Sequence, residues 1–440
     1  MSLSTPDSVR KLQRALYAKA KGAPDFRFYT LYDKVYRADV LDFAYRCCRS
    51  NGGAAGVDGQ TFEDIESYGL DRWLGELTGT LREKSYRPQA IRRTYIPKPD
   101  GSQRPLGIPT IRDRVVQTAA RLVIEPIFEA DLPDEQYAYR PRRSALDAVN
   151  AVHRLVISGH TEVVEADLNG YFDTIPHAEL LKSVARRISD RHLLHLIKMW
   201  LVAPVEEADE RGRPHRTTRA KDEGRGIPQG APISPLMANL YMRRFILAWK
   251  QRWEQQLDAH VVNYADDYVI CCRGTGREAH MAMVQLMQRL KLTVNEEKTS
   301  LCCLPAESFD FLGYTVGWCY SKRQRRRMIG SRPSKKSLAR VRREIHELTH
   351  RRWVMLPAKT RVVALNRLLV GWANYFRLGP VWPAYMALDR HARFRLRQWL
   401  RRKHKVAGRG VARFPDRYLH QTLGLVRLTE WMRNLPWANA

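Results

Sequence analysis

Short apolar runs rich in β-branched residues alternate along this chain with longer segments in which apolar residues recur every three or four positions. The first pattern is typical of β-strands and the second of amphipathic helices. Strands are predicted at residues 161–166, 260–263, 268–272 and 309–314, and on both sides of the Pro-Asp-Gly turn within residues 95–109. Helices are predicted at residues 111–130, 235–247 and 338–348. The chain therefore mixes helices with short strands.

Three further segments carry boundary signals. Residues 137–144 are expected to begin a helix. Ser234 is placed as the N-cap of another helix, with Pro235 at its first position. The charged tract at residues 205–225 lacks apolar periodicity, which favours a loop or a ragged hairpin.

Charge narrows the class of partner. The 440 residues include 75 Lys and Arg against 46 Asp and Glu, a formal charge of +29. Such an excess attracts phosphate backbones. A membrane-surface protein would need lipid-anchoring or amphipathic signals as well, and no apolar stretch is long enough to span a bilayer. We therefore expect nucleic-acid partners and no membrane.

Cysteine usage bears on the compartment. The seven cysteines form three adjacent pairs and a singleton, which resembles neither a disulfide framework nor a set of zinc ligands. This pattern favours a reduced, intracellular setting. We therefore expect a cytoplasmic protein.

The two ends of the chain are basic. About the first twenty residues of a basic N-terminal extension, residues 1–27, predict an amphipathic helix with Val9, Leu12 and Leu16 on one face. Such a helix can mimic an organellar transit peptide; an RNA-contacting extension is the favoured interpretation, because Asp7 and Asp25 are present. A basic run after Ser321 predicts a domain boundary, and the residues beyond it are helical and basic.

The most informative residues are Tyr264-Ala265-Asp266-Asp267, at the turn between two predicted strands. Two adjacent carboxylates repel each other, and neither is buried cheaply. A hard divalent cation such as Mg²⁺ removes this conflict, since it prefers carboxylate oxygen. A solvated Asp-Asp turn is the competing interpretation. Asp167 weakens it, because a third carboxylate closes the predicted strand at residues 161–166. Three such acids suit nucleotidyl transfer by two metal ions.

Two other segments predict contacts with a nucleotide. Lys98 and Arg104 flank the turn of the hairpin at residues 95–109, where both can reach one triphosphate. Taken alone, a solvated basic hairpin is the simpler interpretation. Gln229 and Gly230 precede the helix at Pro235, and glycine lets the backbone approach a base pair closely. A purely structural loop-to-helix junction is the alternative.

These segments, taken in order, resemble the reverse transcriptases encoded by bacterial group II introns. The likeness extends from about residue 28 to the end of the chain. It is carried by Ile96-Pro97-Lys98-Pro99 with residues 104–109, by Ala166-Asp167-Leu168 with Tyr171-Phe172-Asp173, by Pro228-Gln229-Gly230 with Ile233-Ser234-Pro235, by residues 264–267, and by Phe311-Leu312-Gly313.

The resemblance implies an α+β right-hand polymerase with a small antiparallel palm sheet and a helical basic C-terminal region. Fingers and palm would occupy residues 28–320, and a thumb with a maturase-like RNA-binding region residues 321–440. Residues 371–376 resemble part of that maturase region, although a helix that buries its aromatic side chains accounts for them equally.

The resemblance also implies site roles. The metal ligands would be Asp167, Leu168, Asp266 and Asp267, of which the three acids are catalytic, with two Mg²⁺ ions or Mn²⁺ in their place. Phe172 would exclude a ribose 2′-hydroxyl, and Gln229 would support the templating pair. Lys98 and Arg104 would contact the triphosphate, and Lys298 would lie near the leaving pyrophosphate. The partners would be template or intron RNA, a DNA or RNA primer, and deoxynucleoside triphosphates.

Three functions follow as hypotheses. The leading one is an RNA-directed DNA polymerase that also assists splicing and mobility of a group II intron. The others are a splicing cofactor with a vestigial polymerase site, and a domesticated relative in phage defence or DNA repair. Because no cysteine follows Cys319, we expect no zinc-dependent DNA endonuclease.

Overall fold

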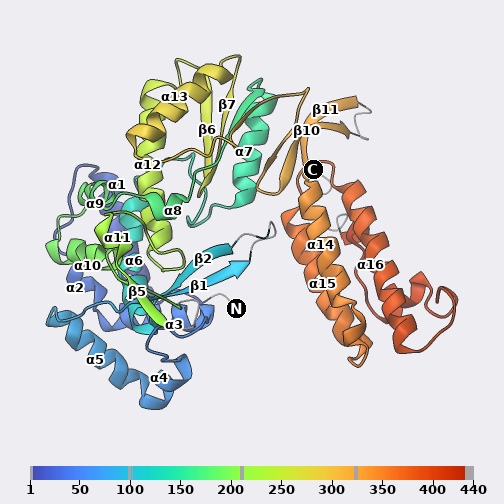
Figure 1. The fold of residues 1–440 in the computed structure, drawn as a ribbon, viewed down its shortest axis with the longest axis horizontal. Coiled ribbons are helices and arrows are strands. Elements are labelled where there is room, and N and C mark those ends of the chain that lie inside the picture. Colours follow the sequence, from blue (N-terminus) through green and yellow to red (C-terminus); the bar gives the residue numbers. More distant parts are fainter. Residues whose placement is uncertain (1–2, 98–100, 102, 209–212, 322–325, 432–440) are drawn as a thin grey trace. The chain divides into compact units, whose positions relative to one another are not determined.

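The computed structural model describes residues 3–97, 101, 103–208, 213–321 and 326–431 (Figure 1). The chain divides into two compact units. The first unit comprises Met1–Ser144, Ala166–Val269 and Arg277–Ser300, and the second comprises Ala145–Glu165, Ile270–Gly276 and Leu301–Ala440. The limits predicted at residues 27 and 320 divide the chain by function. The two compact units do not test them, so they stay predictions.

The first unit is built around helix α6 (Ile111–Glu129), whose side chains are nearly all buried. This confirms the helix predicted at residues 111–130. Helices α1 (Asp7–Gly22), α2 (Tyr32–Val35) and α3 (Ala38–Asn51) pack against α6. The predicted amphipathic helix is therefore present as α1, and Val9 and Leu16 on its apolar face are buried. Helices α4 (Phe62–Tyr68) and α5 (Leu70–Arg82) follow.

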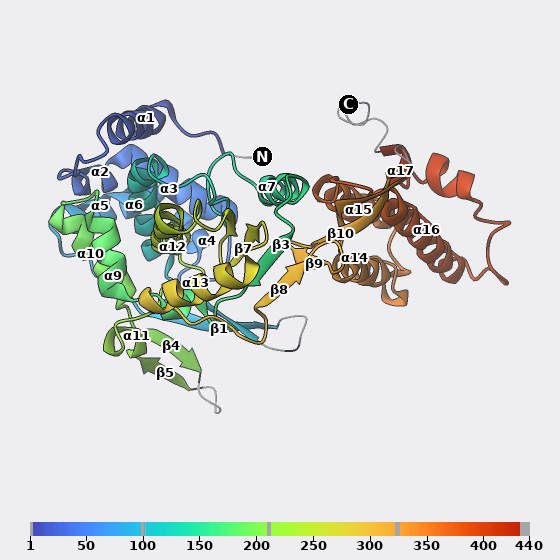
Figure 2. The ribbon, with the colours of Figure 1, turned by 90° about the horizontal axis from the view of Figure 1, so that it is seen from above.

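The first sheet has the strand order β2-β1-β4-β5. Strands β1 (Ile91–Pro97) and β2 (Gln103–Ile108) are antiparallel, which confirms the predicted hairpin. Strand β4 (Val205–Ala208) runs parallel to β1 and antiparallel to β5 (Pro214–Thr217). Helix α11 (Arg219–Asp222) follows (Figure 2). Of the two alternatives for residues 205–225, the hairpin is the one that forms.

The second sheet has the order β6-β7-β3-β8. Its strands are β3 (Glu162–Ala166), β6 (Ala259–Tyr264), β7 (Asp267–Cys272) and β8 (Ser300–Cys303), which confirms the three strands predicted here. The helices that follow β3 and accompany this sheet along the chain are α8 (Tyr171–Thr174), α9 (His177–Ala185), α10 (Arg191–Leu201), α12 (Ser234–Arg252) and α13 (Gly276–Arg289).

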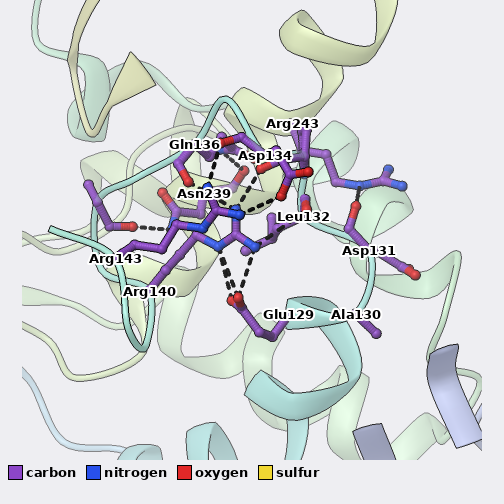
Figure 3. A network of polar contacts seen from close by, with 12 residues as sticks. Glu129, Ala130, Asp131, Leu132, Asp134, Gln136, Arg140, Arg143, Asn239 and Arg243 are labelled. Atoms are coloured by element: carbon purple, nitrogen blue, oxygen red, sulfur yellow. Dashed lines mark hydrogen bonds and ion pairs between the residues drawn. The ribbon is translucent and has the colours of Figure 1, made fainter. Parts of the chain in front are cut away.

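The helix expected to begin at residues 137–144 begins later, as α7 (Ala145–Ile157). Tyr139 and Arg142 have φ angles of 57° and 62°, which a right-handed helix does not allow. The buried Arg140 guanidinium holds the loop open, because it donates to the Glu129 carboxylate at 2.8 Å and to the Gln136 carbonyl at 2.9 Å (Figure 3).

The prediction that Ser234 caps α12 is also wrong. Ile233 occupies the N-cap position, and Ser234 is the first helical residue with Pro235 beside it in the first turn. The Ser234 backbone N–H donates to the Ala231 carbonyl at 3.1 Å, so the chain turns before the serine instead of at it. Its hydroxyl is buried and has no hydrogen-bond partner among the described residues.

The second unit contains the strand order β11-β10-β9, formed by β9 (Phe309–Phe311), β10 (Tyr314–Ser321) and β11 (Arg326–Pro333). Its helices are α7, α14 (Lys335–Leu348), α15 (Ala358–Tyr375), α16 (Trp382–Lys403) and α17 (Leu428–Trp431). The helix predicted at residues 338–348 is confirmed, and Val341 and Ile345 of its apolar stripe are buried. At the end of α15, Phe376 is buried, with its ring centroid 4.5 Å from that of Trp372. No helix in the described ranges is both long and apolar enough to cross a bilayer.

Asp190 joins the N-terminal segment to α10 in the first unit. Its buried carboxylate accepts hydrogen bonds from the backbone N–H groups of Leu31 and Tyr32, both at 2.8 Å, and of His192 and Leu193. Burial by itself raises the pKa of Asp190, but these four donors outweigh it and lower the pKa below the usual value.

We predict that Asp190→Ala destabilises the first unit by about 2 to 4 kcal/mol, because four buried N–H groups lose their acceptor. Asp190→Asn keeps one oxygen and should cost less. Since the folded pKa is lowered, the carboxylate stabilises the protein above about pH 4 and this contribution disappears as pH falls further. Thermal unfolding of wild type and Asp190→Asn should therefore converge toward pH 3. A constant difference between pH 7 and pH 3 would contradict this.

Candidate active site

The turn between β6 and β7 presents the two adjacent acids. Ala265 is buried and has a φ angle of 59°, a left-handed conformation that costs a non-glycine residue about 1 kcal/mol. The Asn263 side-chain amide, also buried, donates to the Ala265 carbonyl at 2.8 Å. This bond stabilises the strained turn and so determines where Asp266 and Asp267 lie. The sequence pattern indicates only that Asn263 belongs to a strand, and it does not indicate this supporting role.

Asp167 follows β3, the strand adjacent to β7 in the sheet. Its carbonyl accepts a hydrogen bond from the Asn295 backbone N–H at 2.9 Å. The Lys298 ammonium lies 3.1 Å from its carboxylate oxygen Oδ2. The side chain of Leu168 is buried and has no donor atom, so this residue could serve as a metal ligand through its main-chain carbonyl alone. Residues 295–298 therefore hold Asp167 in place at the end of its strand.

The fold brings the three acids together, although Asp167 lies far from the other two in the sequence. Burial raises the pKa of Asp267 to about 6, and the negative charges of Asp266 and Asp167 add to the rise. Arg104 and Lys298 act in the opposite direction but do not cancel it. The Asp267 side chain is exposed to solvent. A ligand can therefore reach it, although two other negative charges lie nearby.

Three mutually repelling carboxylates are a donor set that fits divalent cations. Mg²⁺ and Mn²⁺ prefer oxygen ligands, and a bound cation would remove the repulsion that raises the pKa of Asp267. Lys298 and Arg104 supply the nearby positive charge, but neither can accept a proton at neutral pH or coordinate through a lone pair. The residues present therefore fit the metal ions that the sequence led us to expect.

Asp167 and Asp266 line a cleft of about 720 Å³ in the first unit, and Asp267 is the next residue along the β6–β7 turn. The residues lining it include seven of the positions singled out in the sequence: Arg104, Asp167, Leu168, Phe172, Gln229, Asp266 and Lys298. Lys98 lies outside the described residues. Tyr139 also lines the cleft, and no signal in the sequence distinguished it from the aromatic residues of the core. Burial raises the pKa of its hydroxyl, followed by the charge of Asp266.

Phe172 is positioned by its neighbours on both sides. It lies in α8, which begins after Gly170 in a left-handed conformation with φ 54°. The ring of Phe172 packs edge-to-face on Tyr171, with centroids 5.9 Å apart, and the Tyr171 hydroxyl donates to the Ala238 carbonyl at 2.7 Å. The Phe172 carbonyl accepts from the Ile227 N–H at 2.7 Å. The aromatic ring therefore sits on a rigid support at the cleft.

Gln229 is held from its backbone and from its side chain. Its carbonyl accepts from the Gly107 N–H at 2.6 Å, and its side-chain amide donates to the Asp173 carboxylate at 3.2 Å. Gly230 has a φ angle of 111°, and a Cβ placed there would lie 2.7 Å from the Gly107 carbonyl oxygen. Glycine is required here because the backbone comes close to β2. No local pattern in the sequence indicates this contact, and the expected approach of Gly230 to a base pair stays a prediction.

Comparisons with known proteins agree with this site. Residues 96–316 match the family model of the reverse transcriptase (RNA-dependent DNA polymerase), and residues 338–418 match that of the group II intron maturase-specific domain. Protein YkfC of Escherichia coli is 31% identical over 75% of this chain and 93% of its own length. The group II intron-encoded protein LtrA of Lactococcus lactis is 30% identical over 62% of this chain and 43% of its own length.

The mitochondrial nuclear intron maturase 2 of Arabidopsis thaliana is 30% identical over 25% of this chain and 15% of its own length. The alignments thus cover nearly all of YkfC but less than half of LtrA. The first model alone matches half of the chain, and it contains the three carboxylates, the turn between β6 and β7, and the lining residues of the cleft other than Cys47, Cys48, Asn51 and Gly52. The chain belongs to the family of reverse transcriptases and maturases encoded by group II introns, and is an RNA-directed DNA polymerase with nucleic acid as its partner.

Proposed function

We propose that Asp167, Asp266 and Asp267, with the Leu168 carbonyl, hold two divalent metal ions that support DNA synthesis on an RNA template. The observation that carries this proposal is the raised pKa of Asp267, to which the charges of Asp266 and Asp167 contribute, and these two acids line an open cleft. When bound, two such ions activate a primer 3′-hydroxyl and neutralise charge on the phosphate and the leaving pyrophosphate. Mg²⁺ is the expected ion, and Mn²⁺ satisfies the same donor set.

The other residues of the cleft would bind and orient the substrates. The exposed Arg104 offers a bidentate fork to the triphosphate of a deoxynucleotide, and Lys98 would supply a second positive charge to it. Lys298, already beside Asp167, would neutralise the leaving pyrophosphate. Phe172 would occupy the space of a ribose 2′-hydroxyl. Gln229 would support the base pair between the template and the incoming nucleotide, while its amide remains held by Asp173.

In this proposal residues 28–320 act as the fingers and palm of a right hand, with the β6-β7-β3-β8 sheet as the palm. Residues 321–440 act as the thumb and as a surface for intron RNA. The maturase-specific match supports this assignment, as do the basic residues on the face of α14 opposite Val341 and Ile345. The protein would thus assist splicing and mobility of its intron, and residues 1–27 would add RNA contacts.

Asp266→Asn should reduce cDNA synthesis from a DNA primer on an RNA template about a hundredfold or more, because a metal ligand worth several kcal/mol is lost. Primer extension at saturating substrate measures this. Glu278→Gln in α13 is the matched control, since it neutralises an exposed carboxylate away from the cleft and should leave the rate unchanged. Equal activity of Asp266→Asn and wild type would refute the assignment of the ligands.

Asp267→Asn should stabilise the metal-free protein at pH 7 while it abolishes synthesis. The raised pKa means that the ionised Asp267 costs stability, and this cost develops as pH rises from about 4 to about 6. Solvent screening limits the gain to about 1 kcal/mol, a rise of a few degrees in Tm. The stabilisation that Mg²⁺ gives to wild type should be absent in the variant. Calorimetry with EDTA or Mg²⁺ tests both effects. If Asp267→Asn had a lower Tm than wild type in EDTA, the predicted stabilisation would be wrong.

Phe172→Ala should raise the ratio of ribonucleotide to deoxyribonucleotide incorporation about tenfold or more, because the removed ring leaves room for the 2′-hydroxyl, and a lost steric clash is worth at least 1.4 kcal/mol. Phe172→Tyr keeps the ring and serves as the control with unchanged selectivity. The measurement is kcat/KM for each nucleotide on the same primer and template. An unaltered ratio in Phe172→Ala would remove Phe172 from sugar selection.

A further inference from the structure

A smaller cavity of about 230 Å³ lies in the first unit, formed by α9, the end of α6 and the middle of α12. None of its lining residues belongs to the cleft that holds the acids. Its floor is apolar and consists of the buried Phe128 and Leu240. Its other lining residues are Asp131, Ser183 and five cations, namely Lys182, Arg186, Arg187, Arg243 and Arg244.

The charges around this cavity do not balance. Among the described residues, the carboxylates that pair with its cations are Glu179 and Asp131. Glu179 accepts from Arg244 at 2.9 Å and lies 3.1 Å from the Lys182 ammonium. Asp131 lies 3.4 Å from Arg187. Five positive charges therefore face two negative ones. Burial lowers the pKa of Arg243, and the positive charge of Arg186 lowers it further, which is the expected result of uncompensated cations held close together.

Two of the arginines are fixed by bonds to the fold. Arg187 is almost fully buried, and its guanidinium donates to the carbonyls of Ala20, at 2.8 Å, and Pro24. Arg243 donates through Nε to the Asp131 carbonyl at 3.0 Å, on the side of Asp131 away from Arg140 (Figure 3). These bonds fix both guanidinium groups at the cavity. Because the acceptors are neutral carbonyls, the bonds do not neutralise the positive charge.

The remaining donors are available to a ligand. In the described part of the chain, the terminal nitrogens of Arg243 have no hydrogen-bond partner. The exposed Arg186 guanidinium likewise makes no hydrogen bond or ion pair to those residues. A purely structural cluster would use such donors on carbonyls and carboxylates, as Arg187 does. Here the structural bonds are already made and several N–H groups remain.

We propose that this cavity binds a phosphate group of a nucleic-acid backbone, outside the catalytic cleft. Guanidinium forks match the oxygens of a phosphate, and several of them around one cavity can contact the singly charged, tetrahedral phosphodiester from several directions. A phosphate held here would fix the path of a bound RNA across α9 and α12. Free inorganic phosphate offers the same chemistry, so the test must separate these two sources.

The test compares Lys182→Gln/Arg186→Gln with the control Arg252→Gln/Arg289→Gln. The first pair removes two cations that line the cavity and are both exposed, so folding should be preserved. The control removes two exposed arginines of α12 and α13 that line neither cavity. The probe is a 20-nucleotide single-stranded RNA of mixed sequence, with its Kd measured by fluorescence anisotropy over a series of KCl concentrations.

We expect the cavity variant to bind the RNA about tenfold more weakly at 0.1 M salt, and its slope of log Kd against log salt to fall by about 0.7, the value for one lost phosphate contact on a single strand. The control should keep the wild-type slope. Primer extension at saturating RNA should stay at the wild-type rate in both variants, so a failure here is distinguishable from a failure of the catalytic assignment.

A second arm measures Tm with millimolar inorganic phosphate. If RNA binding matches the control while phosphate stabilises wild type and not the cavity variant, the site takes the free anion and the backbone assignment is overturned. If neither RNA affinity nor the phosphate effect differs between the two double variants, the cavity has no anion-binding role and the proposal fails entirely.

Discussion

Three carboxylates gathered at the ends of the adjacent strands β3 and β7 are the constraint on which the rest of the first unit depends. Their repulsion raises the pKa of Asp267 to about 6, and the protein gains nothing in stability from placing them together. Oxygen clusters of this kind suit divalent ions, and a bound cation would remove the repulsion. An enzyme site of this type sits in a locally unfavourable arrangement that the surrounding structure must enforce.

Hydrogen bonds and close backbone packing around the acids hold them in these positions. The Asn263 amide stabilises the left-handed turn at Ala265, and the backbone of Asn295 holds the carbonyl of Asp167. On the opposite side of the cleft, Gly230 allows its loop to approach β2 within a distance that a Cβ would prevent. These local bonds make the positions of the acids, Phe172 and Gln229 a property of the sheet and its loops, and not of flexible side chains.

The excess of basic residues acts at two levels. Most of the +29 charge is a general attraction for polyanions, which is sensitive to salt and carries no register. A few cations are instead fixed in place, as Arg187 and Arg243 are by backbone carbonyls. Fixed cations can hold a backbone phosphate at one position, and this is the difference between attracting RNA and orienting it. A polymerase that also assists splicing needs both, because its RNA must stay bound in a defined path.

Much of the architecture was determined by the sequence itself. Alternating apolar runs located β3, β6 and β7, and the apolar pattern located α6 and α14, because burial on one face imposes a period on the chain. The identity of the acids was also readable, since adjacent carboxylates at a turn have no packing rationale. Local signals were less reliable at element ends. The predictions for Ser234 and for residues 137–144 both failed there. A turn closed by the Ala231 carbonyl precedes the serine, and the bond from Arg140 to the Glu129 carboxylate supports a non-helical path at residues 137–144.

Only the tertiary structure decided which residues meet. The pairing of Lys298 with Asp167, the contact of Gly230 with β2 and the support of Gln229 by Asp173 join segments far apart in the chain, and no local pattern records them. The cationic cavity is the clearest case, since its residues come from α9, α12 and the end of α6. Along the sequence each of these arginines is one basic residue among many, and only folding separates those that balance a carboxylate from those that do not.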